Sequence, residues 1–344
     1  MKKCFTAFFA VLMCIYVAGG TAQAKDLKNY WTKSSVAAEE IEQYVQTVTK
    51  KRSADFIPPE SRIAVFDLDG TIMCDTYPRP FDWLMLVDFV NERGIRLPLA
   101  ARSVAKEIEE TYRDDKPYSM ETQVLKAAVE GYKGLTPADI VKRVDKLKAT
   151  NAEGFSGMVR GDAFYRPMCE LINYLQENEF TVYVVCDTER ITARALVSKK
   201  LGLPMDRVIG TDFSLVAGAQ GSQSSDTYSM RVSDKLVYGG ECDVMNVKMN
   251  KVTAIMREIG RQPVLAFGND LADSSMLNYA VADNPYKSMS FMLINDDSVR
   301  EYGDENEANE LRQACTFNGW RSISMKKDFA EIYGKDVKKV RRLP

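Results

Sequence analysis

The stretch from Ile63 to Thr71 constrains this chain more than any other, because a buried strand ends there in two acids. Its first four residues are apolar, which is typical of a strand buried on both faces of a parallel sheet. Asp67 and Asp69 follow at once, at the carboxyl end of the strand, where open α/β sheets bind their ligands. Two carboxylates this close repel each other, so the pattern predicts a cation site, and Mg²⁺ suits carboxylate oxygens. The same residues also fit a plain Asp-Gly turn.

Composition narrows the possible chemistry. The chain has 344 residues, enough for one large α/β domain with an insertion or for two domains. Acidic side chains slightly outnumber basic ones, 48 against 46, which argues against nucleic acid as a partner. The sequence contains no histidine. This absence excludes Ser-His-Asp hydrolases, histidine-based phosphatases and most zinc hydrolases, so any chemistry must use carboxylates, lysine, hydroxyls or a metal.

Residues 1–24 have the pattern of a signal peptide. Lys2 and Lys3 form a basic start, residues 5–17 form an apolar core, and residues 22–24 match a cleavage site. The apolar run is shorter than the roughly 20 residues that span a bilayer, which disfavours a membrane anchor. We therefore expect an exported protein, periplasmic or secreted, without a membrane span after cleavage. Its five remaining cysteines are an odd number, so at least one is free or pairs between chains.

Apolar strands alternate with helical segments from residue 62 to residue 295. This alternation predicts a Rossmann-like α/β fold, with a mainly parallel sheet and helices on both faces. Four helical segments interrupt it after the first strand, and we assign residues 81–155 to a helical cap inserted there. Residues 25–80 and 156–300 then form the catalytic core.

Two further segments depart from this rhythm. Tyr228, Met230 and Val232 alternate with polar residues, so we expect one strand of a small β-hairpin insertion there. The strand at 290–295 is expected to be the last. Beyond it the sequence becomes highly charged, and we expect residues 301–344 to form a C-terminal extension.

The motif Asp67-Leu68-Asp69-Gly70-Thr71 resembles the first signature of the haloacid dehalogenase (HAD) superfamily in its phosphatase form. A counterpart of the second signature follows the strand at 180–185. The superfamily has Ser or Thr at its end, where this chain has Cys186, a weaker donor, and Thr188 lies two residues further on. Cys186 is equally well explained as a small buried residue.

The third and fourth signatures follow in the expected order. Lys251 opens a helix as the third signature requires, and Lys248 competes with it from three residues earlier on the same helical face. Gly268 to Asp273 resembles the acidic loop of the fourth signature. Asn269 replaces its usual first acid, and Asp270 restores a carboxylate one residue later.

The resemblance implies a phosphatase that works through an aspartyl-phosphate, similar to the phosphoserine phosphatase-like branch. Asp67 would be the nucleophile, and Asp69 the general acid and base. The implied ligands of Mg²⁺ are Asp67, Asp69 through its main-chain carbonyl, Asn269, Asp270 and Asp273. The implied phosphate-binding residues are Thr71, Cys186, Thr188 and Lys251.

The implied substrate is a small phosphomonoester, such as phosphoserine or phosphocholine. The cap and the loop at 72–80 would contact its leaving group, with Asp75 and Arg79 as the candidate contacts. The alternative is a non-catalytic phosphate-binding or scaffold protein on a degraded HAD core. The departures at Cys186 and Asn269 favour that alternative, whereas the intact second acid, Asp69, argues against it.

Overall fold

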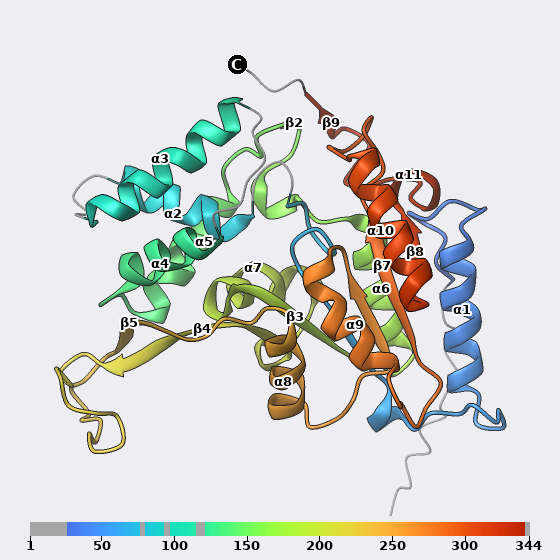
Figure 1. The fold of residues 1–344 in the computed structure, drawn as a ribbon, viewed down its shortest axis with the longest axis horizontal. Coiled ribbons are helices and arrows are strands. Elements are labelled where there is room, and N and C mark those ends of the chain that lie inside the picture. The colour runs from blue at the N-terminus through green and yellow to red at the C-terminus, as the bar shows by residue number, and fades with distance from the viewer. Residues whose placement is uncertain (1–25, 76–79, 93–96, 115–120, 341–344) are drawn as a thin grey trace, which may run out of the picture.

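Seven strands form one sheet in the order β5-β4-β3-β1-β6-β7-β8 in the computed structural model (Figure 1). The structure describes residues 26–75, 80–92, 97–114 and 121–340. Six strands run parallel, and β5 runs antiparallel to β4. The strands are β1 (Ile63–Phe66), β3 (Thr181–Glu189), β4 (Val208–Ala217), β5 (Leu236–Val244), β6 (Leu265–Gly268), β7 (Met289–Ile294) and β8 (Arg321–Ser324). The predicted α/β fold is confirmed.

Helices cover both faces of the sheet. Successive side chains of a strand point to opposite faces, and here both sets are apolar, so each face needs a covering layer. In β1, Ala64 and Phe66 belong to the core beneath α1, α6 and α7, whereas Ile63 and Val65 belong to the core beneath α8, α9 and α10. The helices are α1 (Val36–Thr49), α6 (Arg166–Glu177), α7 (Arg190–Leu201), α8 (Met249–Glu258), α9 (Ser274–Val281) and α10 (Glu305–Asn318). None of the helices in the described part of the chain is long and apolar enough to cross a membrane.

A ladder of stacked phenylalanines ties the three central strands together. Phe66, Phe267 and Phe291 are partners in register on β1, β6 and β7. Their ring centroids are 4.3 Å and 5.1 Å apart, with an interplanar angle of 10° in both pairs. All three are buried. Because β1 and β6 end immediately after this ladder, the stacking fixes where the segments that follow leave the sheet.

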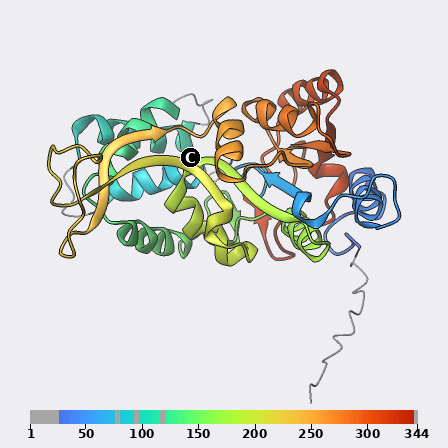
Figure 2. The same cartoon turned by 90° about the horizontal axis from the view of Figure 1, so that it is seen from below.

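The described part of residues 81–155, the predicted cap, contains four helices. They are α2 (Phe81–Asn91), α3 (Leu99–Asp114), α4 (Glu121–Tyr132) and α5 (Pro137–Lys148). The turn between α4 and α5 docks on β5, where the main chain of Tyr238 pairs with Gly134 and Leu135 at 2.9 Å. The ring of Tyr132 packs edge-on against Phe213 and Tyr238. Figure 2 shows the cap and the β4–β5 hairpin at one end of the molecule, and α1 with α10 at the other.

The predicted hairpin is present, but the strand expected at Tyr228, Met230 and Val232 is wrong. These residues lie in a long loop, and the strands are the segments on either side of it, β4 and β5. The loop projects from the lower left in Figure 1. Met230 and Val232 are exposed there, so their alternation with polar residues has no packing surface to stabilise a strand.

The prediction that residues 301–344 form an extension outside the core is also wrong. β8 pairs in parallel with β7, so the strand at 289–294 is not the last of the sheet. Ala308, Leu311 and Cys315 of α10 are buried against the sheet, as is Ile323 of β8. Most charged residues of the described part of this region are exposed, although Glu301 and Asp328 are buried, and they obscured the short apolar pattern of its buried side.

The last described residues of the chain pair with the segment in which the chain returns from the cap to the sheet. There β9 (Lys338–Lys339) pairs antiparallel with β2 (Phe155–Ser156). The Tyr302 hydroxyl lies 2.8 Å from the carbonyl oxygen of Gly154 and 2.7 Å from that of Val340. The Phe155 ring packs against Tyr302 and Tyr333.

We expect Phe291→Ala to lower the free energy of unfolding by about 3–5 kcal/mol, because it opens a cavity in the phenylalanine ladder. Phe317→Ala is the matched control. Its ring is 90% exposed on α10, so the change should stay below about 0.5 kcal/mol. Urea unfolding followed by circular dichroism measures both. Equal effects would contradict the role given to the ladder.

Candidate active site

A lysine ammonium joins two buried carboxylates at the carboxyl end of the sheet. Lys251 Nζ donates to Asp67 Oδ1 at 2.6 Å and to Asp273 Oδ1 at 2.7 Å. The three residues are 3%, 4% and 2% exposed, in the order Lys251, Asp67, Asp273. A charge-assisted contact of this length, removed from water, is strong and fixes all three side chains.

Three separate elements bring these side chains together. Asp67 follows β1, and its main-chain N–H donates to Phe267 of β6 at 2.9 Å, so the two strand ends stay paired. Lys251 lies in the first turn of α8 on its buried side. Asp273 precedes α9, and Gly268 at the end of β6 leaves room for it, since a β-carbon there would lie 2.5 Å from Asp273 Oδ2.

Electrostatics at this point are dominated by negative charge. Burial and the neighbouring Asp273 raise the pKa of Asp67 well above its usual range, and Lys251 opposes that rise. Burial lowers the pKa of Lys251, but Asp273 and Asp67 outweigh burial, so the pKa of the lysine is raised and it stays charged. Asp187 adds a further negative charge that acts on both. One lysine therefore balances more than one carboxylate, and a second cation would be stabilised here.

The side chain of Asn269 indicates where such a cation fits. Its side-chain amide lies 3.0 Å from the Thr71 hydroxyl, 2.9 Å from the main-chain carbonyl oxygen of Asp69 and 3.3 Å from Asp67 Oδ2. With its NH₂ group turned toward them, the amide donates to these oxygens, and this orientation satisfies its hydrogen bonds without a cation. With its oxygen turned toward them, the amide would join the oxygens of Asp67 and Asp69 in the donor set that Mg²⁺ prefers.

The other predicted ligands are engaged elsewhere. Asp273 uses its second oxygen to accept from the Asn269 main-chain N–H at 3.1 Å, and Asp270 accepts from Ala272 N at 2.6 Å. Within the described ranges, no group of three or more His, Cys, Asp or Glu side chains is arranged to hold a metal ion. A cation would thus be held by one carboxylate, one main-chain carbonyl and one amide.

A sharp turn brings the first motif close to Asn269. Gly70 has a φ of +76°, and its N–H donates to Met73 O at 2.7 Å. A β-carbon at Gly70 would overlap the Asn269 amide, so only glycine fits there. The Asn269 amide nitrogen also lies 3.4 Å from Asp75 Oδ2. Burial, followed by the charges of Asp270 and Glu301, raises the pKa of Asp75 to about 7.

The second acid, Asp69, has a different partner from the first. The Thr188 hydroxyl donates to Asp69 Oδ2 at 2.6 Å, and Asp69 Oδ1 has no hydrogen-bond partner among the residues that the structure describes. Burial, then the charges of Asp187 and Asp82, raises the pKa of Asp69, while Thr188 opposes the rise. Asp69 therefore tends to keep its proton, as a general acid must.

Three of the four predicted phosphate-binding residues already have hydrogen-bond partners within the protein other than Asp67. Thr71 is fully buried with its hydroxyl on Asn269, and Thr188 is committed to Asp69. The Cys186 thiol is fully buried and lies 3.7 Å from the Ile209 carbonyl oxygen. In this conformation the thiol donates its proton to a main-chain carbonyl oxygen. Lys251, the fourth predicted phosphate-binding residue, contacts Asp67, the predicted nucleophile. Arg79, one of the two predicted substrate contacts, lies outside the described residues.

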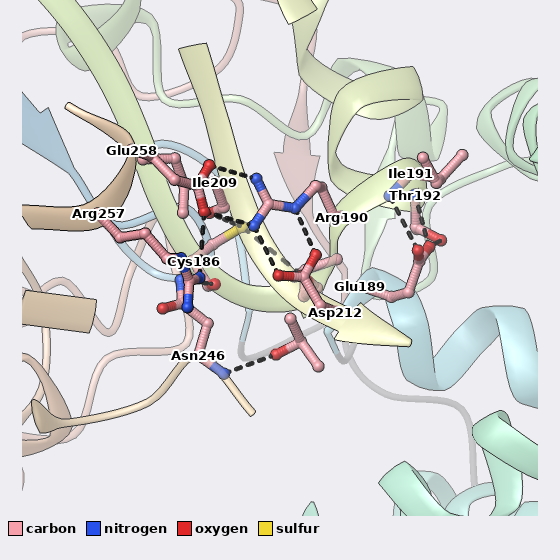
Figure 3. A network of polar contacts seen from close by, with 12 residues as sticks. Cys186, Glu189, Arg190, Ile191, Thr192, Ile209, Asp212, Asn246, Arg257 and Glu258 are labelled. Carbon is pink, nitrogen blue, oxygen red and sulfur yellow. Dashed lines mark hydrogen bonds and ion pairs between the residues drawn. The ribbon is translucent and has the colours of Figure 1, made fainter. Parts of the chain in front are cut away.

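A polar network behind the second motif is not apparent from the sequence (Figure 3). Asn246, fully buried, donates from its side chain to the Cys186 carbonyl oxygen at 2.8 Å. Arg190 donates to Asp212 of β4 at 2.6 Å and to Glu258 of α8 at 2.6 Å. This network ties α8, which carries Lys251, to β4 and α7. The only sequence signal for Asn246 is its place five residues ahead of Lys251.

A family model for haloacid dehalogenase-like hydrolases matches residues 64–278, well over half of the chain. This protein therefore belongs to the haloacid dehalogenase-like hydrolases, the family whose signatures the four motifs resemble. Comparison with curated proteins gives no match.

Three solved structures are similar to this chain. A conserved protein of unknown function from Anaerococcus prevotii DSM 20548 has a TM-score of 0.52 at 14% identity, covering 87% of this chain and 94% of its own. Cytosolic 5′-nucleotidase IIIB bound to cytidine has a TM-score of 0.48 at 13% identity, covering 84% and 86%. A phosphoserine phosphohydrolase-like protein from Francisella tularensis subsp. tularensis SCHU S4 has a TM-score of 0.41 at 13% identity, covering 73% and 92%. The first of these likenesses supports the fold assigned above.

Lys251→Met should lower the free energy of unfolding by about 3–5 kcal/mol, because it leaves two buried carboxylates without their cation. Lys248→Met is the matched control and should change it by less than about 0.5 kcal/mol, since Lys248 is exposed. Urea titrations of both variants measure the difference. If Lys248→Met proved the more damaging, the assignment of Lys251 to the third motif would be wrong.

Proposed function

We propose that this protein is a Mg²⁺-dependent phosphatase that hydrolyses a small phosphomonoester through an aspartyl-phosphate. One observation carries the proposal. Asp67 has one carboxylate oxygen on Lys251, and the other lies 3.3 Å from the Asn269 amide group, which also lies 2.9 Å from the Asp69 carbonyl oxygen. A buried carboxylate held by a lysine on one side and by a cation-binding set of oxygens on the other is prepared to attack phosphorus.

In the first half-reaction, an Asp67 carboxylate oxygen forms a bond to phosphorus while the bond from phosphorus to the leaving oxygen breaks. Asp69 gives its proton to that oxygen, so an alcohol departs. In the second half-reaction, water attacks the aspartyl-phosphate and Asp69 takes a proton from it. Inorganic phosphate leaves and Asp67 returns to its carboxylate form. Lys251 stays charged throughout and offsets the negative charge that gathers at phosphorus.

The residues present fit a magnesium ion. It would be held by Asp67 Oδ2, the Asp69 main-chain carbonyl and the Asn269 amide oxygen. Asp273 would not bind the ion, but it accepts hydrogen bonds from Lys251 and from the Asn269 main-chain N–H and so positions both residues. When bound, Mg²⁺ supplies positive charge to the oxygens of the transferring phosphoryl group. The replacement of an acid by Asn269 leaves an oxygen donor at this point, because a side-chain amide also presents an oxygen.

Substrate, branch and location are parts of the same proposal. The half-buried Asp75 lies beside Asn269, where it would meet a leaving group, and Arg79 is proposed as its companion on the same loop. A four-helix cap inserted directly after the first motif supports a place in the phosphoserine phosphatase-like branch, with phosphoserine or phosphocholine as model substrates. We further propose that the protein is exported to the periplasm or secreted.

Asp67→Asn is expected to lower kcat for p-nitrophenyl phosphate by at least about 10³-fold, because an amide oxygen cannot form the aspartyl-phosphate. Asp226→Asn, in the exposed loop after β4, is the control and should keep wild-type activity. Release of p-nitrophenol measures both. Wild-type activity in the Asp67→Asn protein would contradict this mechanism. If the wild-type protein hydrolysed none of a panel of phosphomonoesters, the non-catalytic scaffold alternative would be favoured.

Chelation offers an independent test of the magnesium assignment. EDTA should abolish activity and added Mg²⁺ should restore it. Mg²⁺ should also raise the melting temperature, because a ligand that binds only the folded state stabilises it. Asn269→Ala should weaken that thermal shift at a given Mg²⁺ concentration, whereas Asn306→Ala, on the exposed face of α10, should not. Activity that persists in EDTA, with no Mg²⁺-dependent shift, would rule out this site.

A further inference from the structure

Thr188 occupies a position that the proposed phosphatase mechanism leaves unexplained. It lies near the end of β3 and is 1% exposed, and its hydroxyl donates to Asp69 Oδ2 at 2.6 Å. The resemblance to the family implied a role for this residue in binding phosphate. A hydroxyl has one proton to donate, and here that proton is already used by the second acid.

The backbone of β3 explains why the hydroxyl reaches Asp69. The pairing of β3 with β4 shifts register between Val185 and Glu189, directly around Thr188. Irregularities of this kind redirect a side chain from the sheet face toward a neighbouring site. On its other side, β3 pairs in parallel with β1, so the two strands deliver Thr188 and Asp69 to the same edge of the sheet.

The contact leaves the two oxygens of Asp69 in different states. Oδ2 is held by Thr188, and Oδ1 is buried with no hydrogen-bond partner in the described part of the chain. Asp187 and Asp82 are the other charged groups that act most strongly on Asp69, and both are negative. Among the described residues, Thr188 makes the one hydrogen bond to the Asp69 carboxyl group, so its hydroxyl is the group that restrains this side chain.

We propose that Thr188 is a positioning residue for the general acid, and that it holds Asp69 so that Oδ1 faces the leaving oxygen. The inference rests on the proposed phosphatase function and assigns within it a residue that works through Asp69 rather than on the phosphate. Proton delivery matters most when the leaving group is a poor one, such as an alkoxide, and least when it is p-nitrophenolate. Loss of the hydroxyl should therefore damage the two classes of substrate unequally.

The experiment compares Thr188→Val with Thr188→Ser in the full chain with Mg²⁺. Valine keeps the shape and removes the hydroxyl, whereas serine keeps the hydroxyl. For β-glycerophosphate, Thr188→Val should lower kcat by about 10–100-fold with little change in KM, and for p-nitrophenyl phosphate by less than about 3-fold. Thr188→Ser should restore most of the loss. Thr181→Val, at the far end of β3, is the matched control and should change neither.

Two further measurements separate positioning from phosphate binding. Inhibition by inorganic phosphate should be the same in Thr188→Val and wild type, because the hydroxyl does not contact the phosphate. In an Asp69→Asn background, Thr188→Val should cause no further loss with β-glycerophosphate, since the two residues act as a unit. Thermal unfolding of each variant separates these effects from loss of the fold.

The proposal is overturned if Thr188→Val slows both substrates equally, if it weakens inhibition by phosphate several-fold, or if it keeps full activity on β-glycerophosphate. The last result, with an active wild type, would leave the phosphatase function intact and remove only the role of Thr188. A wild type without activity on either substrate would instead overturn the function and this inference together.

Discussion

The contact of one lysine with two buried carboxylates is the interaction on which the rest of the structure depends. Lys251 comes from α8, Asp67 from the end of β1 and Asp273 from the segment before α9, so the contact joins three elements that are far apart in the sequence. Loss of the lysine would leave two buried carboxylates without a compensating charge, at a cost of several kcal/mol. The same arrangement that orients Asp67, the proposed nucleophile, therefore holds α8 and α9 at the edge of the sheet.

Around that centre, neutral side chains do most of the positioning. Thr71 holds Asn269, Thr188 holds Asp69 and Asn246 holds the main chain of Cys186. Hydroxyls and amides can do this without adding to a region already crowded with negative charge. A site built from carboxylates and one lysine needs such partners, because histidine, the usual second contact of an acid in hydrolases, is absent from the sequence.

Long apolar runs and ordered motifs allowed much of this to be predicted from the sequence. The strands at β1, β3 and β6 are buried on both faces, so their composition identified them, and the parallel sheet then placed Asp67 near Lys251. Partially buried strands were missed. β5 and β8 have one buried residue each, Tyr238 and Ile323, so neither strand stands out in the sequence. The partner of Thr188 also escaped prediction, because a local register shift decides where its hydroxyl points.

The pairing of β2 with β9 has a consequence for how the chain matures. It joins positions 182 residues apart, at the point where the polypeptide returns from the cap. On a ribosome, every catalytic motif has been made by residue 273, yet β2 still lacks its partner. At 5–20 residues per second, the gap between the two strands corresponds to roughly 10–40 s of synthesis. A nascent chain can thus contain every residue of the proposed active site, with its cap already docked on β5, before residues 338 and 339 pair with β2 at the point where the chain leaves the cap.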